Sequence, residues 1–130
     1  MTAKTSVNPW SWQDARGFTQ AWRVEGASTI VYVSGQVAVD ADGNLVGAGD
    51  FELQARQTFE NIATVLTQAG ATFADVVKLN VYLTDTANLP AYGRIKADYI
   101  QGQQPASTAV GVTALAIPGL LLEVEATAVF

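Results

Sequence analysis

The chain has 130 residues, 49% of them hydrophobic, and a formal net charge of −5 at pH 7. The length is that of one domain, and an acidic chain with only seven scattered basic residues is a poor candidate for a nucleic-acid binder. The absence of cysteine and histidine excludes disulfides, thiol nucleophiles, serine–histidine triads and the usual zinc sites. Oxygen ligands could still hold a metal, but the sequence shows no spaced cluster of carboxylates, so we expect no metal site.

The beginning of the chain lacks the apolar segment of a signal peptide, and no apolar run reaches the ~18 residues of a membrane span. We therefore expect a cytoplasmic protein that does not bind membranes. Residues 1–16 are polar, contain Pro9, Trp10 and Trp12, and predict an irregular arm ahead of a single domain, residues 17–130. Exposed apolar groups usually make contacts, which favours docking of the arm or a lid over a cleft.

An alternating pattern predicts a first strand at residues 18–24, and β-branched and aromatic residues predict a second at 30–33. Ser34-Gly35-Gln36 interrupts this strand before it resumes at 37–39, and glycine inside a strand indicates a bulge or a close backbone approach. Asp50 can cap a helix that runs to about residue 69, with Gly70 as its stop. The apolar stripe of this helix consists of Leu53, Phe59, Ile62, Ala63 and Leu66.

A third alternating segment, residues 77–83, predicts a strand, and Asn88 can cap a shorter helix that runs to about residue 100 with Pro90 in its first turn. Strands at 107–113 and 120–130 complete the chain. This order predicts an α+β fold in which two helices pack on one face of a single mixed sheet. The other sheet face is largely polar, which suits an interior between subunits; it carries Lys78, Asn80, Tyr82, Glu123, Glu125 and Thr127.

Several segments of the chain follow one another as in a known family: GFTQAWRV, VYVSGQVAVDADGNLVG, QARQTFENIATVLTQAGATFADVVKLNVYLTD, PASTAV and EVEATAV. Over residues 17–129 the chain thus resembles the RidA/YjgF family, formerly described as translation inhibitors or L-PSP endoribonucleases. The resemblance implies a chorismate-mutase-like fold and a homotrimer with a barrel-like interior and small-molecule clefts between subunits. It also implies cofactor-free hydrolysis of 2-imino or 2-enamino acids to 2-keto acids and ammonia.

The resemblance also assigns roles to single positions. The family's arginine, which holds the substrate carboxylate, is Ser107 here; its tyrosine is Phe18, and its asparagine in the second helix is Gly93. Only the glutamate that positions water is kept, as Glu123. Charge-assisted hydrogen bonds contribute about 1.5–3 kcal/mol each, so a lost bidentate clamp predicts weak or absent activity on 2-iminobutanoate and 2-iminopropanoate. The missing charge could come from Arg16, Arg23 or Arg94.

Alternatives remain open at these positions. Ser107 is a turn residue, a ligand donor or, least favoured, a nucleophile with Lys78, Lys96 or Glu123 as its base. Glu123 either serves the pocket or bonds to backbone groups or a neighbouring subunit, and for Glu125 an interface ion pair is favoured.

The candidate site therefore has Glu123 as its catalytic residue. The candidate ligand-binding residues are Ser107, Phe18, Ser34, Gly35, Gln36, Tyr92 and Gly93. The favoured function is a small-molecule-binding trimer that is either a hydrolase (deaminase) of an imine or enamine or a non-catalytic metabolite-binding or regulatory protein. RNA binding is a disfavoured third possibility.

Overall fold

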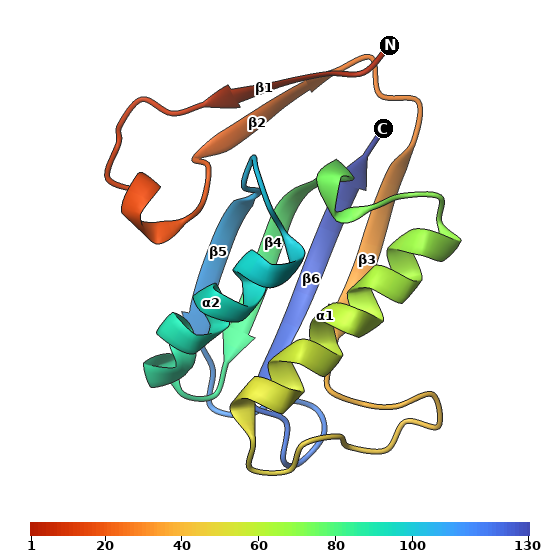
Figure 1. Cartoon of the computed structure of the whole chain (residues 1–130), viewed down its shortest axis with the longest axis vertical. Coiled ribbons are helices and arrows are strands. Elements are labelled where there is room, and N and C mark those ends of the chain that lie inside the picture. The colour runs from red at the N-terminus through yellow and green to blue at the C-terminus, as the bar shows by residue number, and fades with distance from the viewer.

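A computed structural model describes residues 1–130 and shows a four-stranded mixed sheet with two helices on one face (Figure 1). The central strand β6 is antiparallel to both of its neighbours, and β4 and β5 are parallel. This arrangement confirms the predicted α+β fold. In sheet order the strands are β3 (Ile30–Gln36), β6 (Leu122–Val129), β4 (Val76–Leu83) and β5 (Ala106–Gly111), and the helices are α1 (Phe51–Gln68) and α2 (Leu89–Tyr99).

The N-terminal arm is more regular than predicted. Strand β1 (Ala3–Val7) pairs antiparallel with β2 (Ala21–Glu25), and the two form a separate ribbon beyond the end of the main sheet (Figure 1). The prediction of an irregular arm was wrong for this segment, because β1 is polar and mostly exposed and takes its order from a distant pairing partner. The predicted first strand begins later, at Ala21, and Thr19 makes only an isolated bridge to Ala106.

The capping residues and the apolar periodicity predict both helices, but they do not predict the position of every side chain in them. Asp50 caps α1 as predicted, since its side chain accepts a hydrogen bond from the backbone N–H of Leu53 at 3.1 Å. Leu53 itself is exposed, because the buried stripe of α1 runs through Gln54. Asn88 holds the predicted N-cap position of α2, but its side chain makes no cap hydrogen bond. A 3-10 turn precedes α2, and Asp85 caps this turn.

The strand ends also differ from the sequence pattern. Strand β3 ends at Gln36, and the predicted continuation at 37–39 is not a strand. The reason is that the side-chain amide of Asn61 in α1 donates to the carbonyls of Val37 and Val39, at 2.8 and 2.9 Å, and so takes the place of a strand partner for this backbone. The pairing of β3 with β6 shifts register between Val33 and Gln36, which confirms the predicted bulge.

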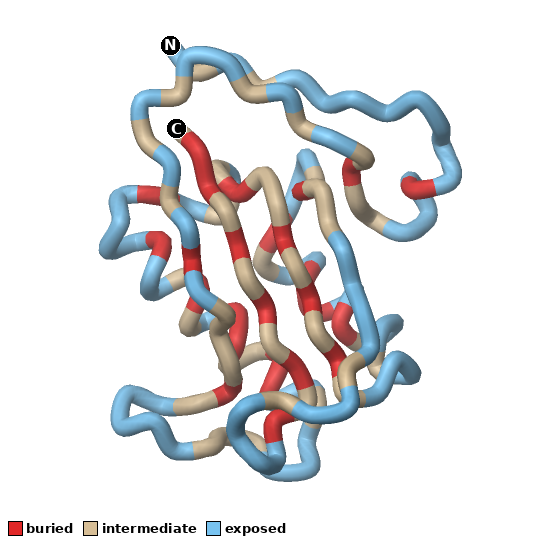
Figure 2. Tube along the Cα trace, turned by 180° about the vertical axis from the view of Figure 1, so that it is seen from behind, coloured by how far each residue is buried: buried red, intermediate tan, exposed pale blue.

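The hydrophobic core lies between the sheet and the two helices. Along β4 and β6 buried residues alternate with partly exposed ones, and seen from behind the open face of the sheet shows this alternation directly (Figure 2). Phe59 of α1 forms the aromatic centre of the core and stacks on Tyr99 of α2 with ring centroids 5.1 Å apart. Neither helix combines the length and the apolar character needed to cross a membrane. The sheet therefore has one buried face and one open face, and this difference decides where each site residue lies.

Candidate functional site

Ser107 and Glu123 lie on opposite faces of the sheet. In the strand register Leu79 pairs with Ser107, and Tyr82 pairs with Glu123. Paired residues of neighbouring strands direct their side chains to the same face, and successive residues alternate. Leu79 is fully buried beneath the helices, so Ser107 lies on the helix side, whereas Tyr82 and Glu123 lie on the open side. Within one chain, the predicted site residues therefore fall into two separate groups.

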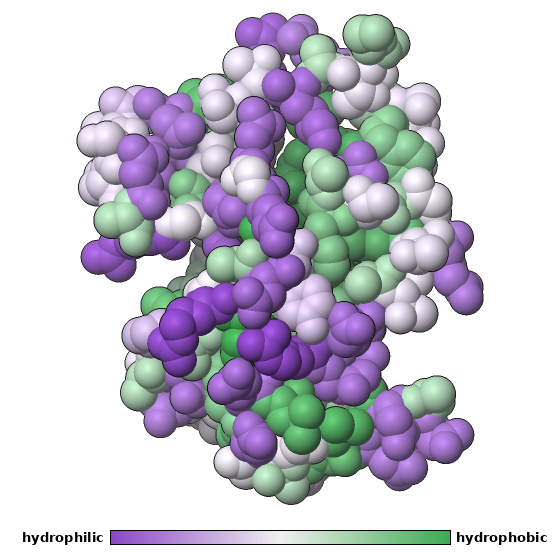
Figure 3. Space-filling model, in the orientation of Figure 1, coloured by the Kyte–Doolittle hydropathy of each residue, from purple (hydrophilic) through white to green (hydrophobic).

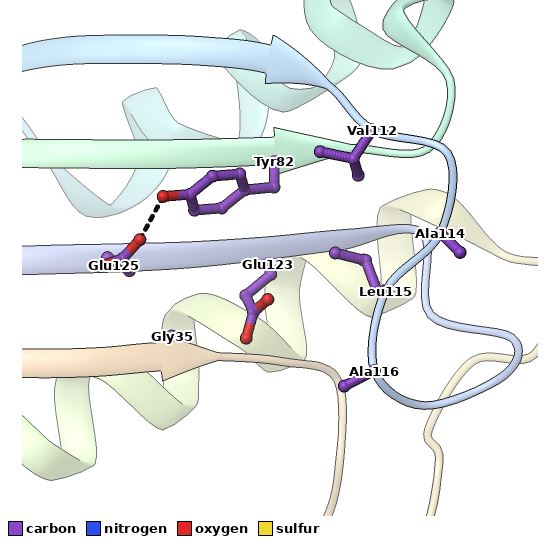
Figure 4. Close-up of a pocket in the computed structure, with 8 residues that line it drawn as sticks. All are labelled: Gly35, Tyr82, Val112, Ala114, Leu115, Ala116, Glu123 and Glu125. Carbon is purple, nitrogen blue, oxygen red and sulfur yellow. Dashed lines mark hydrogen bonds between the residues drawn. The ribbon is translucent and has the colours of Figure 1, made fainter.

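The first group surrounds a pocket of about 320 Å³ on the open face, which we call the Glu123 pocket (Figure 4). Strands β3, β4 and β6 form its floor, and the loop after β5 closes one end (Figure 4). Its lining consists of Gly35, Tyr82, Val112, Ala114, Leu115, Ala116, Glu123 and Glu125. Of the predicted site residues it contains Glu123 and Gly35. The loop from Val112 to Ala116 carries no sequence signal for a site, because the residues that it gives to the pocket are all apolar.

Gly35 makes room for the Glu123 carboxylate. A Cβ at position 35 would lie 2.7 Å from Cδ and 2.9 Å from Cγ of Glu123, well inside van der Waals contact. The glycine in the β3 bulge is thus a close approach, as its position inside a strand predicted. The half-buried Glu123 carboxylate makes no hydrogen bond or ion pair within the chain. It is therefore a free acceptor that is held in a pocket.

Glu125 differs from Glu123 because it has a partner within the chain. The Tyr82 hydroxyl donates a short hydrogen bond to its carboxylate (Figure 4). This hydrogen bond, together with burial and the negative charges of both glutamates, raises the pKa of Tyr82. The Glu123 pocket therefore holds two carboxylates and no lysine or arginine. No group of three or more carboxylates lies close enough together to hold a metal ion.

The second group surrounds a pocket of about 610 Å³ between the N-terminal arm, α2 and β5, which we call the Lys96 pocket. Figure 3 shows this side of the molecule, with a hollow between the arm and α2. Its lining consists of Trp12, Ala15, Arg16, Phe18, Leu89, Pro90, Tyr92, Gly93, Lys96, Ser107 and Ala109. Four predicted ligand-binding residues meet here, namely Phe18, Tyr92, Gly93 and Ser107. The Trp12 ring packs edge-on against Phe18, with centroids 5.6 Å apart, so this part of the arm docks on the domain.

Lys96 is the buried cation of this pocket. Only 7% of the residue is exposed, and its Nζ donates a 2.6 Å hydrogen bond to the Gly17 carbonyl. It makes no ion pair with a carboxylate of the chain, and burial lowers the pKa of its amine. From the sequence, Lys96 is a candidate only as a base for Ser107. The signal for a pocket role was its spacing, because residues three and four apart, such as Gly93 and Tyr92 relative to Lys96, share one helix face.

Two predicted ligand-binding residues lie outside both pockets, and a third, Tyr92, is buried. Ser34 and Gln36 line neither pocket, and the Gln36 side chain donates to the Ser34 carbonyl at 3.1 Å. The Tyr92 ring packs on Phe59 at 5.7 Å, and its buried hydroxyl has no hydrogen-bond partner. Burial raises the pKa of Tyr92 strongly. Tyr92 thus contributes a ring to the pocket wall and belongs mainly to the core.

The three arginines that could supply the missing charge differ in position. Arg16 is exposed and lines the Lys96 pocket. Arg23 forms an exposed ion pair with Glu25 at 3.1 Å, and Arg94 is exposed and lines neither pocket. Of the three, only Arg16 lines a pocket that contains predicted ligand-binding residues.

Known proteins resemble this chain along most of its length. Residues 12–130 match the family Endoribonuclease L-PSP. A Yersinia pestis protein of unknown function from the conserved Rid family has a crystal structure with a TM-score of 0.88 and 39% identity, covering 98% of both chains. The 3-aminoacrylate deaminase RutC of Acinetobacter baylyi is 35% identical over 102 residues, which is 78% of this chain and 80% of that protein. A RutC family protein of Pyrococcus abyssi is 33% identical over 111 residues, 85% of this chain and 84% of its own. The chain belongs to the Endoribonuclease L-PSP family, and its resemblance to the RidA/YjgF proteins is thereby confirmed.

Proposed function

We propose that the protein is a cofactor-free hydrolase of a small imine or enamine and that Glu123 positions the attacking water. The observation that carries this proposal is the Glu123 carboxylate, which is unpaired, half-buried and fitted against Gly35 in a pocket. A free carboxylate can accept a proton from water next to an electrophilic carbon. The similarity to a 3-aminoacrylate deaminase supports an enamine as the substrate class.

The reaction needs few groups. An enamine first tautomerises to an imine, and water then adds to the C=N carbon while Glu123 takes one of the water protons. Return of that proton to nitrogen gives the carbinolamine, and transfer of its hydroxyl proton to nitrogen then lets the C–N bond break, so that ammonia leaves as the C=O bond forms. The overall change is imine plus water to carbonyl plus ammonia, so no oxidant or reductant is required.

We propose that the working unit is a cytoplasmic homotrimer whose clefts lie between subunits. Ser107 and Glu123 point to opposite faces of one sheet, so they can share a cleft only if they come from different chains. The open face also carries Tyr32, which is 79% exposed, beside the partly exposed polar residues of β4 and β6. A partner subunit on this face would cover these groups.

Ser107 favours a second candidate, a non-catalytic metabolite-binding or regulatory trimer. A serine cannot form the bidentate, charged clamp that an arginine offers to a carboxylate. For the same reason we propose that 2-iminobutanoate and 2-iminopropanoate are poor substrates. An endoribonuclease is not favoured, because the Glu123 pocket has two carboxylates, the chain carries a net charge of −5, and phosphates need cations.

The deciding experiment measures ammonia release from 3-aminoacrylate, 2-iminopropanoate and 2-iminobutanoate, each generated in the cuvette. We expect the protein to release ammonia from 3-aminoacrylate faster than buffer alone does. We expect its rates with the two 2-imino acids to be lower than its rate with 3-aminoacrylate. Glu123→Gln should lower the rate by about 10²-fold or more, as expected for a lost general base. Glu60→Gln, at an exposed carboxylate of α1, is the matched control.

Hydrolysis no faster than in buffer for every compound would exclude the hydrolase and leave the binding protein. Fast turnover of 2-iminobutanoate that is lost in Glu123→Gln would support the hydrolase. It would contradict the prediction that a serine at position 107 makes this compound a poor substrate.

A further inference from the structure

Lys96 is the most deeply buried lysine of the chain, and the proposed hydrolysis does not use it. The other lysines are Lys4 and Lys78. Both are partly exposed, and their Nζ atoms donate to the Ala74 carbonyl at 3.1 Å and to the Thr108 hydroxyl at 3.0 Å. Lys96 is only 7% exposed and lines the Lys96 pocket. A buried amine therefore lies beside a cavity that a small molecule can enter.

No ion pair stabilises the charged form of this amine. The Nζ atom of Lys96 has one hydrogen-bond partner, the Gly17 carbonyl at 2.6 Å. The other ionisable groups that line the pocket are Arg16 from the arm and Tyr92 from α2, and β5 contributes none, so no carboxylate faces the amine. Burial lowers the pKa of Lys96, so its amine is neutral more often than that of an exposed lysine. The neutral amine has a lone pair and is the nucleophilic form.

We propose that Lys96 is a nucleophile that forms an imine with a small, uncharged aldehyde or ketone in the Lys96 pocket. Lysines that are desolvated in apolar pockets are activated for this chemistry. Most of the wall is apolar or aromatic, with Trp12, Phe18 and Leu89 as its largest such side chains. The volume of about 610 Å³ has room for an organic body. An uncharged carbonyl compound suits this wall because it needs no ion pair to enter.

The reaction balances without an oxidant or a reductant. The Nζ lone pair adds to the carbonyl carbon, and transfer of a proton from nitrogen to oxygen gives a carbinolamine. Its hydroxyl takes up a proton and leaves as water while the C=N bond to Lys96 forms. The Ser107 hydroxyl lies in the same wall and is a hydrogen-bond donor for the carbonyl oxygen. The reverse steps release the carbonyl compound, so the modification is reversible.

This inference goes beyond the proposed function. It concerns the helix side of the sheet, whereas Glu123 lies on the open side. It joins the ligand covalently to the protein and releases water, whereas the proposed hydrolysis releases ammonia. The two reactions therefore have separate readouts, and the failure of one does not decide the other.

The test is reductive trapping of the full chain with benzaldehyde and cyanoborohydride, which converts an imine to a stable secondary amine. Peptide mass spectrometry gives the rate of labelling at each lysine, with the α-amine measured separately. Binding next to the amine and the larger neutral fraction should make Lys96 react at least about tenfold faster than Lys4 or Lys78. This comparison is made within one folded chain, so it does not depend on any variant. In guanidinium chloride, where the pocket is lost, the preference for Lys96 should disappear.

Variants provide the matched controls. Lys96→Met and Lys96→Arg should both lose the fast labelling, and the arginine keeps a positive charge and a long stem but forms no imine. Lys78→Met should retain the fast labelling, because Lys78 lines neither pocket. Glu123→Gln should retain it as well, although the same variant should lose ammonia release.

Each other outcome overturns the proposal. Labelling of Lys96 at or below the rates of Lys4 and Lys78 means that the buried amine is not a nucleophile and only holds Gly17 against α2. A preference for Lys96 that persists in guanidinium chloride comes from the local sequence and not from the pocket. Loss of the labelling in Glu123→Gln would assign the reaction to the Glu123 pocket.

Discussion

Gly35→Ala should separate the stability of this protein from its chemistry. The added Cβ would lie 2.7 Å from Cδ of Glu123, whereas carbon atoms pack best at about 3.5–4.0 Å. The carboxylate must therefore move by about 1 Å. It has no hydrogen bond to lose, so we expect the free energy of unfolding to fall by only about 1 kcal/mol, the lower end for overpacking. A catalytic group displaced by about 1 Å can lose about 10²-fold in rate, so turnover should fall far more than stability.

A double-mutant cycle checks this reasoning without depending on any activity. Denaturant unfolding is measured for the native chain, Gly35→Ala, Glu123→Ala and the double variant. Without the Glu123 side chain, Gly35→Ala should be neutral or should stabilise by about 0.4–1 kcal/mol, because alanine restricts the unfolded chain and position 35 does not have a positive φ. The effect of Gly35→Ala on the free energy of unfolding should thus change sign when the Glu123 side chain is removed. The difference between the two effects is the coupling energy of the two positions. Zero coupling, or full turnover by Gly35→Ala, would refute the close approach as the reason for this glycine.

Further predictions concern the helices, the core and the assembly. Tyr92→Phe removes a buried hydroxyl without a partner, so denaturant unfolding should show a gain of about 1 kcal/mol, and a loss would reveal a partner for the hydroxyl. Gln54→Leu deprives three backbone groups of their hydrogen bonds to a fully buried amide and should cost about 3 kcal/mol or more in the same assay; a cost below about 1 kcal/mol would contradict this. Gly93→Ala places its Cβ in open space on α2 and should raise the free energy of unfolding by about 0.5–1 kcal/mol, with an unchanged value as the contrary result. If Lys96 and Glu123 of different subunits share a cleft, random co-refolding of Lys96→Met with Glu123→Gln restores about a quarter of the native activity, whereas clefts within one subunit would give none.

The sequence predicted those elements whose signals are local. Helix α1 has its cap at Asp50 and its stop at Gly70, both as expected. Strand β6 alternates so regularly that the open-face position of Glu123 could be predicted from the pattern alone. The Gly35 bulge was equally predictable, because a glycine between strand residues is typical of a bulge or a close backbone approach. The hydrophobic periodicity of a segment is enough to predict its structure where burial of one side decides that structure.

Strand β1 is an element that local sequence patterns do not predict. Its five residues are polar and mostly exposed, and their order comes from β2, about twenty residues further along the chain. The end of β3 is similar. The sequence pattern predicts that the strand continues through Val37 and Val39, but the side chain of Asn61 in α1 binds the carbonyls of these two residues. Both depend on partners distant in the sequence, and no local pattern contains them.

By itself the sequence determined the α+β fold, the family, the candidate glutamate and the serine that replaces the family's arginine. Only the tertiary structure decided that Ser107 and Glu123 face opposite sides of the sheet, because this depends on how β5 and β6 pair with β4. It also decided which cation is buried, since a lysine on α2 looks solvated until the N-terminal arm folds over it. A periodic pattern specifies the face of an element. Packing between segments far apart in the chain decides which residues lie next to that face. The same packing therefore decides the charge of each pocket.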